Sequence, residues 1–245
     1  MKTVFRGVLL LALLAGFAPP APAAEFTVAQ RAEIIAIIRD ALKNDPSILR
    51  DAVTALQADE GVQTAAATRA AIADQKDSLV GPGDPVAGNP KGDVTIVEFF
   101  DTRCPYCRKM EPVMGQFLAG DKKVRLVYKD LPILGPASTL GSKALLAAQK
   151  QGAYEKMRDA VMALPPDTTM PMIQDAARKL GLDGERLAHD MDDPAVQARI
   201  DANLKLAHTL GIQGTPALIV GGDLVPGALD LAELRRVVAE ARKGG

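Results

Sequence analysis

The apolar residues in the first part of the chain recur at the spacing of helices. Between residues 26 and 56 they fall three or four positions apart. The segment Asn44–Ser47 interrupts this pattern, and its proline suits the first turn of a new helix. Thr27 and Gln30 form a candidate capping box in front of the first helix. Alanine-rich sequence continues the pattern, which predicts a helical extension over residues 26–79.

A glycine- and proline-rich stretch separates this extension from the rest of the chain. Residues 80–93 hold four glycines and three prolines, which predicts a linker. Residues 94–100 (VTIVEFF) are apolar on both alternating faces, as in an interior strand. A helix is predicted over residues 105–120, and alternating apolar residues after residue 123 predict a second strand. Strand, helix and strand in this order indicate a βαβ unit.

The remaining sequence predicts a helical block, a hairpin and a last helix. Residues 137–211 have helical periodicity throughout, with glycines at plausible helix ends. The stretch from residue 215 to residue 227 predicts a hairpin, and residues 230–242 predict the final helix. The order βαβ, helical block, ββα defines an α/β fold without internal repeats.

The first residues have the pattern of a secretory leader. Lys2 and Arg6 precede an apolar run from Val8 to Ala18, and small residues follow. This run is much shorter than the ~20 residues that span a bilayer. Residues 1–23 are therefore predicted to be a signal peptide, which indicates an exported protein in a disulfide-permissive compartment.

Charge and length narrow the classes of function. Loss of Lys2 and Arg6 with the leader makes the net charge two units more negative than the −1 of the full chain. A nucleic-acid partner would need a concentrated basic surface, so none is expected. The rest of the chain is long enough for one sizeable core and an accessory element.

The two cysteines of the chain, Cys104 and Cys107, are two residues apart. As a structural staple they would close too short a loop to stabilise the fold much. A zinc site needs four ligands, and the two histidines, His189 and His208, lie far along the chain without the usual spacing. No metal or other cofactor is therefore expected.

A redox-active thiol pair fits the local pattern better. Cys104 stands where the predicted helix begins, so the helix dipole favours its thiolate, and Pro105 suits the first helical position. We expect Cys104 to be an exposed attacking thiol with a lowered pKa and Cys107 to be the buried resolving thiol. Further positive charge nearby comes from Arg103, Arg108 and Lys109.

The element order and the CPYC motif resemble the thioredoxin fold of the DsbA family. VTIVEFFDTRCPYC is similar to the strand and active site of that family, and GIQGTPALIV is similar to its proline loop. The resemblance covers about residues 85–242, and the helical extension makes the chain look closest to the periplasmic ScsC-like proteins, which are linked to copper tolerance. It implies a thioredoxin fold with an inserted helical domain (about 137–210) in a domain of residues 81–245. Residues 24–80 would be the N-terminal extension.

Two positions bear on how far the resemblance reaches. The dipeptide Pro105-Tyr106 also occurs in glutaredoxins, so it leaves the direction of the redox reaction open. Thr102 replaces the aromatic residue often found two places before the first cysteine in these relatives.

The resemblance also implies roles for other residues. Glu98 would be the buried acid beneath the disulfide that shuttles a proton to or from Cys107, and Lys129 would be the basic residue that pairs with it. From the residues alone, Glu98 reads equally as a structural acid and Lys129 as a surface lysine. Substrate contacts would come from a cis-proline loop and the motif, namely Thr215, Pro216, Pro105 and Tyr106.

These features predict an exported thiol–disulfide oxidoreductase that acts on protein thiols or disulfides, with a membrane redox partner. The extension would form a homo-oligomer through residues 26–79, a dimer or trimer, and gathered CPYC sites would favour disulfide isomerisation. A chain that starts near Gly83 is expected to be a folded monomer.

Three alternatives remain open at this level. The protein could be a monomeric DsbA-like dithiol oxidase. It could be a Cu(I)-binding module that uses Cys104, Cys107, Met110 and Met114, although methionines on a helix are more often core residues. In a third interpretation, the N-terminal helices are a docking arm for partners and the redox site is secondary.

Overall fold

The computed structural model describes residues 26–244 of the chain. The predicted signal peptide lies outside the described residues. The chain divides into two compact units at Gln57 and Ala58, and each is described by itself. No helix within residues 26–244 is long and apolar enough to cross a membrane.

The first unit holds helix α1 (Val28–Asn44) and the first part of helix α2 (Ser47–Asp74). The predicted capping box is present, because the Thr27 side chain accepts from the Gln30 backbone while the Gln30 side chain accepts from the Thr27 backbone. The Asp45 carboxylate accepts from the Ser47 N–H at 3.0 Å where the second helix begins. Helix α1 has no buried residue, so its apolar side chains are uncovered within this unit.

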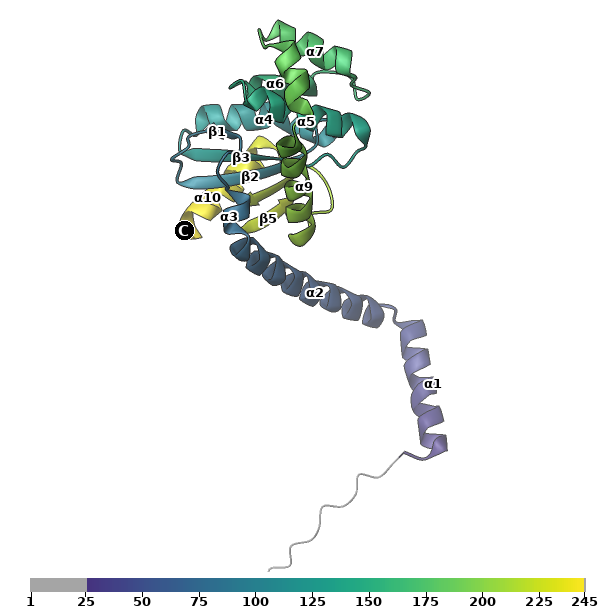
Figure 1. The fold of residues 1–245 in the computed structure, drawn as a ribbon. Coiled ribbons are helices and arrows are strands. Elements are labelled where there is room, and N and C mark those ends of the chain that lie inside the picture. Colours follow the sequence, from purple (N-terminus) through teal and green to yellow (C-terminus); the bar gives the residue numbers. More distant parts are fainter. Residues whose placement is uncertain (1–25, 245) are drawn as a thin grey trace, which may run out of the picture. The chain divides into compact units, whose positions relative to one another are not determined.

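The second unit is built on a five-stranded sheet of order β1-β3-β2-β4-β5 (Figure 1). The strands β2 and β3 are parallel, and the other neighbours are antiparallel. Seven-residue strands β2 and β3 occupy the centre because their β-branched and aromatic residues are buried on both faces. The strands are β1 (Val86–Gly88), β2 (Val94–Phe100), β3 (Val124–Asp130), β4 (Ala217–Val220) and β5 (Asp223–Pro226).

Eight further helices complete the described part of the chain, five of them inserted between β3 and β4. They are α3 (Lys76–Leu79), α4 (Pro105–Gly120), α5 (Pro136–Gln149), α6 (Tyr154–Met162), α7 (Met170–Lys179), α8 (Gly184–Met191), α9 (Pro194–Thr209) and α10 (Leu231–Gly244). The expected α/β architecture is confirmed: a thioredoxin fold with a helical insert, preceded by a helical extension.

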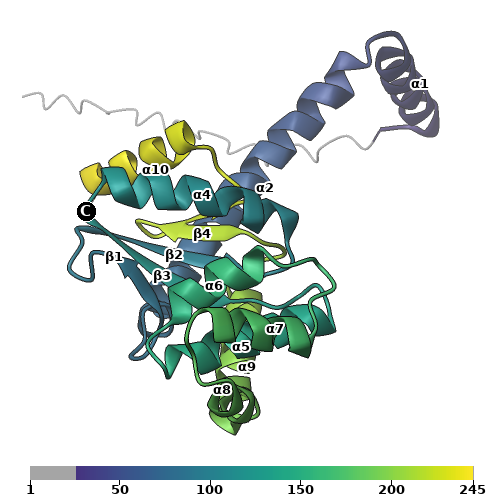
Figure 2. The same cartoon turned by 90° about the horizontal axis from the view of Figure 1, so that it is seen from above.

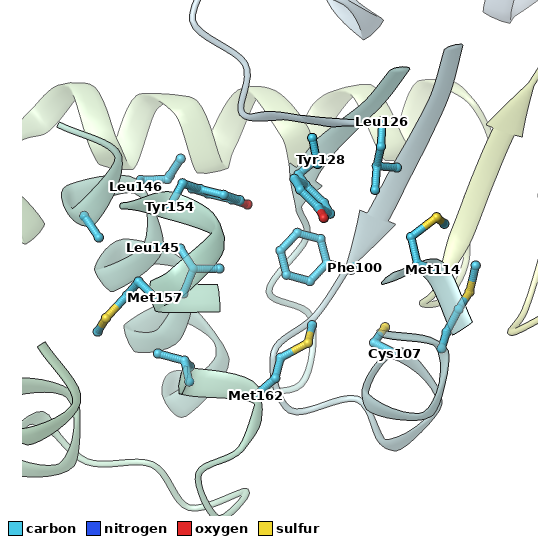
Figure 3. Close-up of a cluster of buried hydrophobic side chains, with 14 of the residues drawn as sticks. Phe100, Cys107, Met114, Leu126, Tyr128, Leu145, Leu146, Tyr154, Met157 and Met162 are labelled. Carbon is cyan, nitrogen blue, oxygen red and sulfur yellow. The ribbon is translucent and has the colours of Figure 1, made fainter. Parts of the chain in front are cut away.

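The sheet buries a different set of residues on each face. Alternate residues such as Ile96, Phe100 and Leu126 face α4, α10 and the helices of the insert. Figure 2 shows α4 and α10 side by side along the sheet, and Figure 3 shows Phe100 between Cys107 and the side chains of the insert. The other residues of the same strands, including Phe99 and Val127, face the end of α9 and residues 72–79.

The glycine- and proline-rich residues 80–93 differ from the predicted linker. They contain the edge strand β1, which pairs with β3, and the buried carboxylate of Asp84. The sequence ahead of them also belongs to the second unit, since Ile72 and Leu79 are buried against Phe99 and its neighbours. A chain starting near Gly83 would expose this part of the core, because the second compact unit begins at Ala58.

Candidate active site

Both cysteines lie at the start of α4, where β2 ends. Cys104 is the N-cap residue with an extended backbone, and Pro105 opens the helix, as the sequence predicts. Both cysteines are free thiols, and the Cys104 Sγ donates a hydrogen bond to the Thr215 carbonyl oxygen at 3.1 Å. The helix start therefore presents Cys104 to the loop that precedes β4.

Both thiols are buried, whereas the sequence analysis expected one exposed and one buried thiol. Cys104 is 4% exposed, so the expectation of an exposed thiol is wrong, and Cys107 is fully buried. The Thr215 loop covers Cys104, which sequence alone does not reveal. Burial raises the pKa of the Cys107 thiol, and the nearby Cys104 and Glu98 raise it further. Cys107 is thus held in its protonated form.

A buried aspartate, which the sequence analysis did not single out, fixes the loop in front of the cysteines. Asp101 accepts hydrogen bonds from three backbone N–H groups: Arg103 at 2.8 Å, Ile133 at 2.9 Å and Leu134 at 3.0 Å. It therefore ties the active-site loop to the segment after β3. The sequence does contain a signal for Asp101, because an aspartate there follows a predicted buried strand directly and precedes the start of a helix.

The arginines of the motif also hold backbone in place. The Arg103 guanidinium donates to the Leu134 and Pro166 carbonyls. Arg108 donates to the Thr102 carbonyl at 2.9 Å and to the Leu164 carbonyl at 2.7 Å. These contacts connect the start of α4 to the helical insert, so the arginines contribute more than the local positive charge that the sequence analysis assigned to them.

Thr102, two places before the first cysteine, is almost fully buried. It packs against Gly141 of α5 so closely that a Cβ at Gly141 would collide with the threonine hydroxyl. The helix α5 therefore approaches the active-site loop at a position where both residues are small.

The loop before β4 borders the cysteines. The Thr215–Pro216 peptide bond is cis, as the resemblance implies. A cavity of about 320 Å³ lies along this loop, lined by Thr215, Pro216 and neighbouring residues. On the helix side, Tyr106 is exposed, with the Lys109 ammonium 5.8 Å from the centre of its ring. Tyr106 and this loop are accessible for contact with another chain.

Glu98 lies on the face of the sheet that α4 covers. It is fully buried, and neither carboxylate oxygen has a hydrogen-bond partner among the described residues. The nearest cation is Arg158 of the insert, with 3.6 Å between its Nη2 and Glu98 Oε2. Burial raises the pKa of Glu98, and the Arg158 charge opposes this rise.

Lys129 does not pair with Glu98, so this part of the expectation is wrong. In the parallel β2–β3 pair, Glu98 stands opposite Tyr128 and Lys129 stands opposite Phe99. Because successive side chains point to opposite faces, Lys129 lies beneath the sheet, away from Glu98. Its ammonium is 2.7 Å from Asp84 Oδ2 and 2.8 Å from the Ser78 carbonyl oxygen.

We predict that Lys129→Met lowers stability without changing the chemistry of the site. It removes the buried partner of Asp84, which still binds Arg199, so we expect a loss of about 1–3 kcal/mol. The exposed Lys156→Met is the matched control and should change stability by less than about 0.5 kcal/mol. Urea unfolding and the pH profile of thiol exchange measure both effects. A changed pH profile in Lys129→Met would mean that Lys129 acts on the thiols after all.

The methionines of α4 are core residues. Met110 and Met114 are almost fully buried and pack with Phe117 in the main hydrophobic cluster. Within residues 26–244 there is no group of three or more His, Cys, Asp or Glu side chains that could hold a metal ion. The burial of both methionines favours the packing interpretation over Cu(I) ligation.

Comparison with known protein families decides the relationship. A model of the DSBA-like thioredoxin domain matches residues 95–239, more than half of the chain. The chain belongs to the DsbA-like thioredoxin family. This is a family of thiol–disulfide oxidoreductases. A second model, the copper resistance protein ScsC N-terminal domain, matches residues 30–61 of the helical extension.

Solved structures agree with this assignment. A thioredoxin-like oxidoreductase from Silicibacter pomeroyi is 43% identical, with a TM-score of 0.67 over 69% of this chain and 99% of that chain. A linker-deletion mutant of Proteus mirabilis ScsC is 27% identical, with a TM-score of 0.68 over 91% of this chain and all of that chain. The thiol-disulfide exchange protein alpha-DsbA2 from Wolbachia pipientis is 30% identical, with a TM-score of 0.66 over 71% and 95%.

The DsbA-like domain also occurs within longer proteins. Na(+)/H(+) antiporter NhaA 3 of Salinispora tropica is 30% identical over 169 residues, which are 66% of this chain and 26% of that protein. The chain thus spans about a quarter of this relative. Disulfide bond formation protein D of Bacillus subtilis is 22% identical over 174 residues, 66% of this chain and 78% of that protein.

Proposed function

We propose that this DsbA-like chain is an exported thiol–disulfide oxidoreductase that acts on cysteine-containing proteins through Cys104 and Cys107. The observation that carries this proposal is the placement of the pair: Cys104 stands at the N-cap position of α4 and its thiol contacts the cis-proline loop, while Cys107 is buried with a raised pKa. A thiolate at a helix start is a good attacking and leaving group, and a buried thiol is suited to resolution.

The chemistry then follows from this asymmetry. In the oxidised protein, a substrate thiolate attacks the Cys104 sulfur, and Cys107 leaves and takes a proton from Glu98. A second substrate thiolate attacks the substrate sulfur of the mixed disulfide, so the substrate is oxidised and Cys104 leaves as a thiolate. The reverse sequence reduces a substrate disulfide. An extended substrate segment would lie along the Thr215–Pro216 loop and its cavity, with Pro105 and Tyr106 on the other side of the cysteines.

The oxidised protein should transfer its disulfide to a reduced, unfolded protein that has several cysteines. Loss of substrate thiols, matched by the appearance of two thiols per protein chain, measures the transfer. The double variant Cys104→Ser/Cys107→Ser is the control and should leave the substrate at its uncatalysed rate. Equal rates with the control would refute the proposed activity.

We further propose that the helical extension joins sister chains and that the assembly isomerises disulfides. The first unit carries uncovered apolar side chains along both of its helices, among them Ile35, Ile38, Leu49 and Leu56, each about half exposed. Burial of apolar side chains that face water lowers the free energy, so these faces favour contact with another apolar surface. The match of residues 30–61 to the ScsC N-terminal domain supports a second copy of this chain as the partner that buries these faces.

We also propose that a membrane redox partner in the periplasm keeps the CPYC site in its working redox state.

We predict that Glu98→Gln slows exchange by about 10²-fold near neutral pH and flattens its pH dependence. Burial raises the pKa of Glu98, so its ionised fraction, and with it the rate at which Cys107 is deprotonated, rises with pH through that raised value. Glutamine keeps the volume but removes the titration. Thiol exchange followed from mildly acidic to mildly basic pH measures this, and an unchanged profile would leave Glu98 a purely structural role.

A further inference from the structure

Arg158 of the helical insert brings a buried positive charge to the active-site face of the sheet. It belongs to α6, and its side chain is 3% exposed. The guanidinium carbon lies 4.6 Å from the centre of the Tyr128 ring and 4.9 Å from the centre of the Phe100 ring. Stacking against two aromatic rings from β2 and β3 fixes the guanidinium beside the strand that carries Glu98.

Three carboxylates surround this guanidinium, and they differ in exposure. Glu98 Oε2 lies at 3.6 Å, Asp159 Oδ1 at 3.8 Å and Glu111 Oε1 at 3.9 Å. The side chains of Asp159 and Glu111 are 60% and 34% exposed, whereas that of Glu98 is fully buried. The Coulomb interaction is strongest where water is excluded, so Glu98 is the partner on which Arg158 acts most.

The contact between Arg158 and Glu98 is electrostatic and not a hydrogen bond. Neither Arg158 Nη2 nor either oxygen of Glu98 has a hydrogen-bond partner among the described residues. The carboxyl can therefore gain or lose a proton without breaking a hydrogen bond to the guanidinium. Such a pair stabilises the anion while leaving its oxygens accessible to a proton.

The other titratable groups on this face of the sheet have smaller effects on the ionisation of Glu98. The charges with the largest effect on the pKa of Glu98 are those of Arg158 and Glu111, and Glu98 in turn raises the pKa of Cys107 and Tyr128. The cysteines Cys104 and Cys107 lie on α4, and Tyr128 is held neutral by burial, which raises its pKa. Asp130 is bound to the Tyr154 hydroxyl at 2.7 Å, and burial raises its pKa to about 7.

We propose that Arg158 is the positioning residue that favours the ionised form of Glu98 against the cost of its burial, so that Glu98 can accept the proton of Cys107 during resolution of the mixed disulfide. This inference rests on the proposed function. It assigns to the helical insert the electrostatic role that the resemblance gives to Lys129. The insert thereby sets the pH at which the thiol pair works.

The step that Arg158 controls can be isolated. In the mixed disulfide between Cys104 and a small thiol, the Glu98 carboxylate takes the proton of Cys107. The Cys107 sulfur attacks the Cys104 sulfur, the bond from Cys104 to the small thiol breaks, and the small thiol leaves as a thiolate. Cys104 and Cys107 are then joined, so the protein is oxidised and the reagent reduced. The rate of this step rises with the ionised fraction of Glu98.

The test uses the reduced full-length protein and an excess of an aromatic disulfide, bis(nitrobenzoate) disulfide, in a stopped-flow instrument. Attack by Cys104 releases one coloured thiolate, and resolution by Cys107 releases the second. The rate of the second release is plotted against pH. Its midpoint should rise by about one to three pH units in Arg158→Met, because Glu98 loses the cation that favours its ionised form. Arg158→Lys keeps the charge and should restore most of the shift.

Two further variants protect the test against a folding defect and a direct effect on Cys107. Glu111→Gln removes the partly exposed acid that raises the pKa of Glu98, so the midpoint should move down, opposite to Arg158→Met. In a Glu98→Gln background, Arg158→Met should shift nothing. An unmoved midpoint in Arg158→Met and Glu111→Gln, or the same shifts without Glu98, would overturn the inference while the exchange activity stands. Absence of a second release in the unmodified protein would overturn the proposed function as well.

Discussion

Cys107→Ser should accumulate stable mixed disulfides through Cys104, and Cys104→Ser should lose exchange by about 10³-fold or more. Cys104 stands at the N-cap position of α4 and contacts the Thr215 carbonyl of the proposed substrate loop, so we expect it to form the first bond. Without the Cys107 thiol, that bond has no internal nucleophile to break it. Non-reducing electrophoresis with a scrambled, disulfide-containing protein substrate shows the trapped species as a new band that a reductant removes: the Cys104 thiolate attacks a substrate disulfide, and the other substrate sulfur leaves as a thiolate.

Cys107→Ala serves as the matched control, because it lacks the hydroxyl that serine would leave buried without a partner. Both Cys107 variants should trap the substrate equally. Trapping by Cys104→Ser through Cys107, or equal residual activity in the single variants, would contradict the assignment of attacking and resolving thiols.

A chain that begins at Ala58 should be a folded monomer that still exchanges disulfides but has lost most isomerase activity. It keeps the whole second unit, including Ile72 and Leu79, and lacks α1 and the first part of α2 with their exposed apolar side chains. In the proposed oligomer of the full chain, several CPYC sites would lie near one substrate, and this would raise their effective concentration for reshuffling. Light scattering measures the mass, and recovery of activity by a scrambled disulfide protein measures isomerisation.

The chain that begins near Gly83 is the informative comparison. It removes Ile72 and Leu79 from the core beneath the sheet, and truncation of one such side chain to alanine costs about 2–5 kcal/mol. Native domains are stable by only about 5–15 kcal/mol, so this shorter chain should be largely unfolded or aggregated. A monomeric full-length protein, or an Ala58 chain that repairs scrambled substrates as well as the full chain, would contradict the oligomeric isomerase and favour a plain oxidase.

The sequence predicted those parts of the fold that local periodicity encodes. The strand at residues 94–100, the helix at 105–120 and the cysteines at its start lie where the pattern placed them. The edge strand β1 was missed because its three residues lie among glycines and prolines that signal a linker. The end of the extension was assigned too far along the chain, because the few apolar residues that bury it, Ile72 and Leu79, give no clear stripe.

The candidate site was less predictable, since it depends on contacts between distant segments. The partner of Glu98 comes from α6, sixty positions further along the chain, and an arginine within a helix gives no signal of its own. Lys129 was expected beside Glu98 on the basis of resemblance, but strand register places them on opposite faces. Cys104 is buried by the loop at Thr215, whose carbonyl oxygen accepts a hydrogen bond from the thiol. The resemblance implied that this loop binds substrate, but it did not show that the loop contacts Cys104.

The most direct test of the account is the alkylation rate of each cysteine in the reduced, unmodified protein at neutral pH. Brief exposure to iodoacetamide, followed by mass spectrometry of the peptides, gives the two rates in one sample. Because burial raises the pKa of Cys107, whereas Cys104 stands at the N-cap position of α4 beside the loop that precedes β4, we predict that label appears almost entirely on Cys104. Equal labelling, or faster labelling of Cys107, would contradict the central claim that Cys104 attacks and Cys107 resolves.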